Sequence, residues 1–174
     1  MCSDKKFSWF KTLHKAIKCH NRRFHFWWRI ANHMYMNGIW VKKAEKINYN
    51  LRNKYSLDIK LGAHIGVGLR ISHYVGIVIA DCCVIGQNFY IKQNVTIGVH
   101  HNDQEGKIYI GDNVEVGANS CIVGENIKIG DGVIVGAMTF VNKSIPAHVT
   151  VYNKRELTHV PHFNPQDSAL TGAA

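Results

Sequence analysis

The chain has 174 residues, enough for one domain with at most a small appendage, and a formal net charge of +9. Its five cysteines are odd in number and form no C-x-x-C pair, which argues against a disulfide framework and favours reduced cytosolic thiols. No apolar run approaches the length of a membrane span, and lysines interrupt the place where a secretory leader would be apolar. These features predict a cytoplasmic protein.

The positive charge is concentrated at the N-terminus. Residues 1–60 hold 14 Lys and Arg against three Asp and Glu, whereas residues 61–174 hold seven against nine. A basic segment rich in aromatic residues can associate peripherally with an anionic membrane or glycan, which would bring the protein to the inner face of the membrane. No nucleic-acid-binding motif accompanies the charge, so we expect no nucleic-acid partner.

The same N-terminal segment is predicted to form amphipathic helices, because apolar residues recur three or four positions apart. The first two runs are Phe7, Phe10, Leu13 and Ile17, and then Phe24, Trp27, Ile30 and Met34. A third run, residues 41–51, follows a break at Gly38. The favoured interpretation is that these helices pack against each other or against the end of the next domain, with their charges in solvent.

From Ile59 onward an aliphatic residue recurs every six positions, with slips of two, seven and one residues. A period of six is neither helical nor alternating, and is typical of a solenoid whose short strands each point one aliphatic residue inward. The predicted inward residues are Ile59, Ile65, Ile71, Ile77, Ile79, Ile85, Ile91, Ile97, Ile110, Val116, Ile122, Val123, Ile129, Val135 and Val141. An ordinary β-sandwich is the alternative, and the near-unbroken register disfavours it.

Three such hexads make one triangular coil, so about 18 residues return the chain to the same corner. A glycine often follows the inward residue, and we expect these glycines to supply turn conformations that other residues resist. The repeat does not reveal its handedness. Crossovers between parallel strands are usually right-handed, and that rule alone predicts a right-handed solenoid.

The repeat breaks in two main places, and both carry histidine. Two extra residues enter around His73, and an insertion at residues 99–107 carries His100 and His101. Insertions in a solenoid usually form loops on its functional face. Asp58 lies 15 residues before His73, close to one coil, so the two are predicted near one corner on successive levels. A carboxylate there can hold one imidazole nitrogen and leave the other as a proton acceptor.

The sequence therefore divides into three parts. Residues 1–57 are the basic amphipathic helical segment, and residues 58–151 are the hexapeptide-repeat domain with its loop insertion at 99–107. The repeat ends there, and residues 152–174 form a C-terminal tail.

Residues 58–98, DIKLGAHIGVGLRISHYVGIVIADCCVIGQNFYIKQNVTIG, resemble the serine acetyltransferase family of hexapeptide-repeat acyltransferases. The motif H-x-x-G-I-V-I followed by I-x-Q-x-V-T-I-G is specific to that family, and the likeness continues through residues 110–146. The chain looks most like the short members that modify sugars. The resemblance implies a mainly β fold, a left-handed parallel β-helix preceded by a short α-helical segment. It also implies a homotrimer that binds acetyl-CoA, the acetyl donor, between neighbouring subunits.

The resemblance also implies roles for individual residues. His73 matches the catalytic base, and Asp58 matches the acid that pairs with it. Ala118 and Ala137 match small residues along which the pantetheine arm of the donor runs. Lys143 matches a lysine near the CoA phosphates.

Departures from the serine-specific members bear on the acceptor. Those members have an Asp where Ser72 precedes the catalytic histidine, an Arg-His pair after the long loop that is missing here, and an N-terminal helical domain more than twice as long. The C-terminal G-x-P-A turn is also replaced, by VYNKRE. The favoured acceptor is therefore a hydroxyl of a sugar or surface glycan of capsule or lipopolysaccharide type. Its predicted contacts are Ser72, His100, His101 and Asn102.

Three other functions remain open. One is a serine O-acetyltransferase with altered serine contacts, and another is a non-catalytic trimeric scaffold. The third is a carbonic-anhydrase-like zinc enzyme, a class that also forms hexapeptide-repeat trimers. That class carries a His-x4-His pair, which does not occur near the loop, so we expect no metal.

Overall fold

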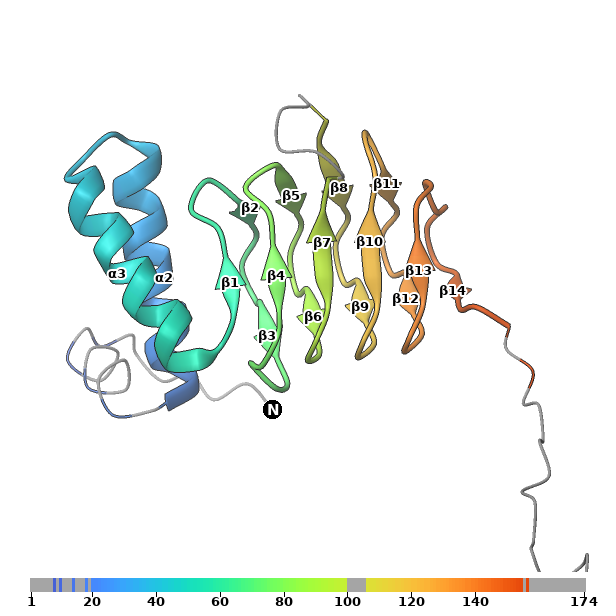
Figure 1. Ribbon diagram of the computed structural model, residues 1–174, viewed down its shortest axis with the longest axis horizontal. Coiled ribbons are helices and arrows are strands. Elements are labelled where there is room, and N and C mark those ends of the chain that lie inside the picture. Colours follow the sequence, from blue (N-terminus) through green and yellow to red (C-terminus); the bar gives the residue numbers. More distant parts are fainter. Residues whose placement is uncertain are drawn as a thin grey trace, which may run out of the picture.

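The computed structural model describes residues 20–99 and 106–154, together with single positions at 8, 10, 14, 18 and 156. Two helices, α2 (His20–Met36) and α3 (Val41–Tyr55), form an antiparallel hairpin beside a solenoid of short strands (Figure 1). They correspond to the second and third predicted helical runs. The first predicted run, residues 7–17, lies largely outside the described residues. Within the described part of the chain, no helix is long and apolar enough to cross a membrane.

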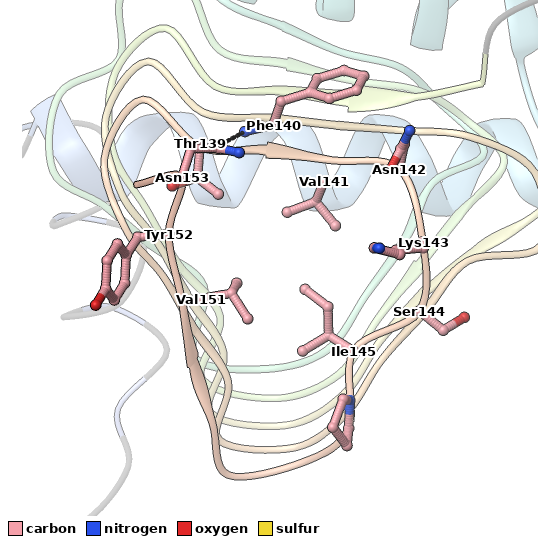
Figure 2. Close-up of a pocket in the computed structure, with 11 residues that line it drawn as sticks. Thr139, Phe140, Val141, Asn142, Lys143, Ser144, Ile145, Val151, Tyr152 and Asn153 are labelled. Atoms are coloured by element: carbon pink, nitrogen blue, oxygen red, sulfur yellow. Dashed lines mark hydrogen bonds between the residues drawn. The ribbon is translucent and has the colours of Figure 1, made fainter. Parts of the chain in front are cut away.

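The strands form three parallel sheets, which are the faces of a triangular prism (Figures 1 and 2). Sheet A contains β1 (Asp58–Ile59), β4 (Val78–Ile79), β7 (Thr96–Gly98), β10 (Cys121–Val123) and β13 (Phe140–Val141). Sheet B contains β2 (His64–Ile65), β5 (Cys83–Ile85), β8 (Ile108–Ile110) and β11 (Lys128–Ile129). Sheet C contains β3 (Arg70–Ile71), β6 (Tyr90–Ile91), β9 (Glu115–Val116), β12 (Ile134–Val135) and β14 (Thr150–Val151).

The strand register confirms the six-residue period and each of its slips. Val78 pairs with Thr96, which is 18 positions on and marks one regular coil. Asp58 pairs with Val78, 20 positions on, because two residues enter around His73. Thr96 pairs with Cys121, 25 positions on, across the seven-residue insertion. The sandwich alternative is therefore wrong.

The coils wind in a left-handed sense, as the family resemblance implied (Figure 1). The expectation from the general crossover rule was wrong. That rule depends on the right-handed twist that strands accumulate along their length. Strands of two or three residues accumulate little twist, so this source of handedness is weak here.

The predicted inward residues form the core. All but one are buried, with exposed fractions from 0 to 9 %. Val123 is the exception and is half-buried, because its neighbour Ile122 takes the inward position. The prism is thus filled by a stack of aliphatic side chains, one from each face at each level.

Most glycines that follow the inward residues serve a different purpose from the one predicted, since the following seven have no positive φ: Gly66, Gly86, Gly98, Gly111, Gly117, Gly130 and Gly136. Five of them, Gly66, Gly86, Gly111, Gly117 and Gly130, allow successive coils to approach. A Cβ on Gly66 would lie 2.5 Å from the carbonyl oxygen of Gly86 in the next coil, and one on Gly117 would lie 2.5 Å from the backbone nitrogen of Ala137. Any side chain at these positions would force neighbouring coils apart.

Asparagines occupy many of the left-handed turn positions. Five of them, Asn88, Asn94, Asn113, Asn119 and Asn126, have φ between 53° and 58°. Their side chains also link the coils, because Asn88 Nδ2 donates to Asn113 Oδ1 at 3.1 Å and Asn94 Nδ2 donates to Asn119 Oδ1 at 3.0 Å. Turn formation and coil stacking thus use the same residues.

The helical hairpin caps the first coil through α2. Trp28 and Arg29 donate to backbone carbonyls of that coil. Asn32 Nδ2 donates to the carbonyl of Ala63 at 2.9 Å, and Asn32 Oδ1 accepts from the amide of Gly62 at 2.7 Å. For the two described helices, the expectation that they pack against each other or against the end of the next domain is confirmed.

Candidate active site

One edge of the prism carries three of the predicted site residues. At this edge, here called the C–A corner, the chain passes from sheet C to sheet A. His73 lies there between β3 and β4, Ala118 between β9 and β10, and Ala137 between β12 and β13. The amide of Met138 donates to the carbonyl of Ala118 at 2.8 Å, so the two alanine turns stack directly. The structure therefore aligns these three residues along one edge, on different levels.

The turn that carries His73 is anchored by the residue after it. The ring of Tyr74 packs on Phe24 of α2 and Tyr55 of α3, with centroids 5.5 and 5.1 Å apart. Burial, with a smaller contribution from Tyr55, raises the pKa of Tyr74 to about 12. The His73 side chain remains exposed. The helical hairpin thus fixes the turn without covering the predicted base.

Asp58 opens the first strand of the same coil. Its Oδ2 lies 2.9 Å from Arg52 Nη2 and 3.4 Å from Lys60 Nζ. Its Oδ1 is buried and has no hydrogen-bond partner among the described residues. Nor is a hydrogen bond to His73 found there, so the predicted pair is not formed in this chain by itself. The acceptor that such a pair would use, Oδ1, is left free.

A cleft of about 270 Å³ opens beside Asp58, where the end of α3 meets the first coil. Residues 52–53 and 56–58 form one side of it, and residues 76–78 form the other. The amide of Gly76 donates to the carbonyl of Ser56 at 2.8 Å, which ties the two sides together. The His73 turn therefore runs directly into one wall of the cleft.

Arg52 and Lys60 are site residues that the sequence did not reveal. The apolar spacing predicted that the third helix ends near residue 51, so Arg52 counted only toward the general basic charge. The helix continues to Tyr55, and Arg52 lies in its last turn beside Asp58. A six-residue separation across a helix end carries no pattern that would identify this contact in advance.

Lys143 and the described ends of the loop insertion lie at a different edge of the prism, between sheets A and B. The insertion at residues 99–107 leaves after β7 and returns before β8, and Lys143 follows β13. Lys143 lines a pocket of about 260 Å³ at the open end of the last coil, beside Val141 and Ile145 (Figure 2). A single chain therefore does not bring Lys143 to the C–A corner.

Of the residues predicted to contact the acceptor, only Ser72 lies among the described residues. His100, His101 and Asn102 lie outside the described residues. Ser72 is exposed and adjoins His73 at the C–A corner. Residues 99 and 106, between which the undescribed part of the insertion lies, are away from the C–A corner, so we expect the loop to share a cleft with His73 only across a subunit boundary. That arrangement stays a prediction.

The described cysteines do not form an alternative centre. Cys82, Cys83 and Cys121 are free thiols, and burial raises the pKa of the Cys83 thiol well above its usual range. A thiol with a raised pKa is a poor nucleophile at neutral pH, because the reactive form is the thiolate. No group of three or more His, Cys, Asp or Glu is arranged to hold a metal in the part of the chain that the structure describes.

Comparison with known sequences points to one family. No family model matches the chain. A serine acetyltransferase of Staphylococcus epidermidis is 41 % identical over 69 residues, which cover 40 % of this chain and 32 % of that protein. Serine acetyltransferase 1, chloroplastic, of Arabidopsis thaliana is 35 % identical over 70 residues, which cover 38 % of this chain and 22 % of that protein. The chain thus matches a third or less of the length of these relatives.

Solved structures give a broader match. Serine acetyltransferase isoform 3 of Entamoeba histolytica, in complex with cysteine, superimposes with a TM-score of 0.75 and 26 % identity, over 92 % of this chain and 57 % of that one. The Neisseria gonorrhoeae serine acetyltransferase, in complex with serine, has a TM-score of 0.70 and 29 % identity, over 77 % and 54 %. The likeness therefore extends beyond the solenoid alone, while leaving nearly half of each solved chain unmatched.

Proposed function

We propose that the chain, which is similar to serine acetyltransferases in sequence and in structure, transfers the acetyl group of acetyl-CoA to a hydroxyl group. The observation that carries the proposal is the alignment of His73, Ala118 and Ala137 along one edge of the prism. This edge offers an exposed base at one level and small side chains at the levels beyond it.

The reaction is a direct transfer. His73 takes the proton of the acceptor hydroxyl as its oxygen attacks the thioester carbonyl, so that a C–O bond forms and the C–S bond breaks. The same imidazole returns the proton to the departing CoA thiolate. Asp58 Oδ1, buried and free, accepts the other ring N–H and stabilises the imidazolium.

The donor lies along the C–A corner. Ala118 is half-buried and Ala137 is exposed, so neither side chain obstructs a pantetheine arm that runs along this edge. Lys143 occupies another corner of the same chain, so its contact with the CoA phosphates would come from a neighbouring subunit. We therefore propose a homotrimer with donor sites between subunits. Light scattering of the purified chain should give three times the mass of the monomer.

Free serine is the acceptor that the relatives favour. The curated relatives reported above are named serine acetyltransferases, and one of the solved structures holds serine. A sugar hydroxyl is the second candidate, because Ser72 places a neutral side chain beside His73 where serine-specific members have an Asp. Ser72, His100, His101 and Asn102 would then contact the sugar.

The basic N-terminal segment would add a peripheral association. Residues 20–57 hold eight Lys and Arg and one Glu, which gives this part a net charge of +7. Attraction to an anionic lipid or glycan surface would weaken as salt rises. Co-sedimentation with phosphatidylserine vesicles at low and high salt tests it, and binding that is absent at low salt would contradict it.

The reaction is tested by measuring thiol release from acetyl-CoA with the purified full chain. L-serine and a panel of mono- and oligosaccharides serve as acceptors. Saturable release with L-serine alone identifies a serine acetyltransferase, and release with a sugar alone identifies the second candidate. If no acceptor supports release, the proposed transfer is contradicted and the scaffold alternative is favoured.

A further inference from the structure

Arg52 projects from the last turn of α3 into the cleft beside Asp58. Its side chain is 41 % exposed, and one guanidinium nitrogen, Nη2, contacts Asp58 Oδ2. Among the described residues no second acidic or carbonyl partner of the Arg52 side chain is found. The other guanidinium nitrogens of Arg52 therefore remain available to a ligand in the cleft.

The two oxygens of Asp58 have separate surroundings. Oδ2 is held by Arg52 and Lys60, whereas Oδ1 is buried and free. The ion pair on Oδ2 fixes the orientation of both the carboxylate and the guanidinium. Oδ1 then stays available to the His73 imidazole. One carboxylate can thus orient the base through one oxygen and anchor Arg52 through the other.

The cluster beside the cleft keeps an excess of positive charge, because two cations, Arg52 and Lys60, contact the single carboxylate of Asp58. An anionic group on a ligand is attracted to such a cluster, and a neutral sugar gains nothing from it. A guanidinium binds a carboxylate through paired N–H groups with defined geometry. A carboxylate held there would lie close to the turn that carries His73.

We propose that Arg52 binds the carboxylate of an amino-acid acceptor and thereby selects serine over a neutral sugar; this inference rests on the proposed acetyltransferase function. Arg52 supplies the fixed arginine whose absence after the long loop had disfavoured serine. It comes from the helical segment instead of from the solenoid, so the acceptor site is completed only where the two parts of the chain meet.

The test compares L-serine with L-serinamide, which keeps the hydroxyl and the amino group but replaces the carboxylate by a neutral amide. Replacing Arg52 by Met should raise the KM for L-serine by about 10- to 100-fold, the range of one charge-assisted interaction. Loss of the Asp58 contact affects both acceptors alike, so the ratio of kcat/KM for L-serine to kcat/KM for L-serinamide should fall by about tenfold or more, while the KM for acetyl-CoA stays near its wild-type value. The KM of Arg52→Lys for L-serine should lie between the values of the wild type and of Arg52→Met, because lysine keeps the positive charge but lacks the paired N–H groups of a guanidinium.

Lys54→Met is the matched control, since it removes another cation from the last turn of α3 that neither contacts Asp58 nor lines the cleft. It should change the preference for L-serine over L-serinamide by less than about fivefold. If Arg52→Met lowered kcat/KM equally for L-serine and for L-serinamide, Arg52 would only position Asp58, and the inference would be overturned. A preference for L-serine lost equally in Lys54→Met would overturn it as well.

Calorimetric titration of the full chain with L-serine separates this inference from the proposed function. Wild-type protein that binds L-serine in an Arg52-dependent manner, but releases no thiol, would refute the transferase and keep the carboxylate site. Wild-type protein that turns over a sugar and neither binds nor acetylates L-serine would refute the carboxylate site and keep the transferase.

Discussion

The solenoid and the helical hairpin hold together in different ways. In the solenoid the environment of a residue follows from its position in the six-residue period, and one aliphatic side chain per face fills each level. In the hairpin the decisive contacts are individual ones, from Trp28, Arg29 and Asn32 to the backbone of the first coil. The solenoid therefore resembles a stack of equivalent layers, and the hairpin resembles a fitted cap.

The difference also concerns charge and function. The hairpin is strongly basic and the solenoid is close to neutral. The candidate acceptor site lies at their boundary, where Arg52 of the hairpin meets Asp58 of the first coil. A regular stack offers identical surfaces at every level, so a specific site arises where the repeat slips or where another element adjoins it.

The largest expected effect is a loss of catalytic rate that leaves the stability of the solenoid unchanged. Replacing His73 by Ala should lower the rate of thiol release by about 10²- to 10⁴-fold, the usual range for a positioned general base. The thermal unfolding midpoint should not change, because the side chain is exposed. His64→Ala, which removes another exposed histidine of the same coil, should leave both quantities unchanged. Activity of His73→Ala within about tenfold of the parent would exclude the assigned role.

The second expected effect tests the stack itself. Ile97 in β7 is fully buried, so Ile97→Ala should lower the free energy of unfolding by about 2–5 kcal/mol. Val67→Ala is the control, because Val67 is 68 % exposed and its truncation should cost less than about 0.5 kcal/mol. Urea denaturation followed by circular dichroism measures both. Similar costs at the two positions would contradict a core defined by the period.

The third prediction concerns the edge of the stack. Ala137→Trp at the C–A corner should raise the KM for acetyl-CoA by about tenfold or more, since a cost of 1.4 kcal/mol already gives that factor. The exposed position means that the larger side chain does not enter the core. Ala147→Trp makes the same change at the corner between sheets B and C and should leave the KM unchanged. An unaltered KM in Ala137→Trp would place the donor elsewhere.

The fourth prediction tests the cap. Asn32→Ala removes the side chain that bonds both Ala63 and Gly62, and should lower the free energy of unfolding by about 1–3 kcal/mol. Asn32→Asp keeps the acceptor for the Gly62 amide but sets a carboxylate oxygen against the carbonyl oxygen of Ala63 at a buried position, so it should cost at least as much as Asn32→Ala. If Asn32→Ala had no effect, the hairpin would not be docked on the first coil through this residue.

The smallest expected effect appears only at high pH. The unfolded Tyr74 side chain loses its proton near its ordinary pKa of 10.0, whereas the folded one keeps it to about 12. The unfolded state therefore binds fewer protons above pH 10, and stability falls as the pH rises from about 10 to about 12. Tyr74→Phe should reduce this fall in the thermal unfolding midpoint. An identical pH profile in the variant would contradict the assigned burial.

The sequence by itself determined the solenoid, its slips and the corner that carries His73. The inward residues, the insertions of two and seven residues and the position of His73 all follow from counting in sixes. Such counting succeeds because each coil pairs with its neighbour in a register that local spacing sets. The function of the stacking glycines was misjudged, because the approach of two backbones is a property of neighbouring coils and leaves no mark in one hexad.

Only the tertiary structure decided the surroundings of Asp58. The six-residue period predicted that this carboxylate pairs with His73, but in the structure it forms ion pairs with Arg52 and Lys60. The contact with Arg52 depends on how far α3 continues and on how the hairpin docks on the first coil. Both are settled by the packing of Trp28, Tyr55 and other buried residues, many positions away in the chain. A period describes the interactions that repeat, and a contact between a helix end and a strand occurs once, so its geometry depends on the complete fold.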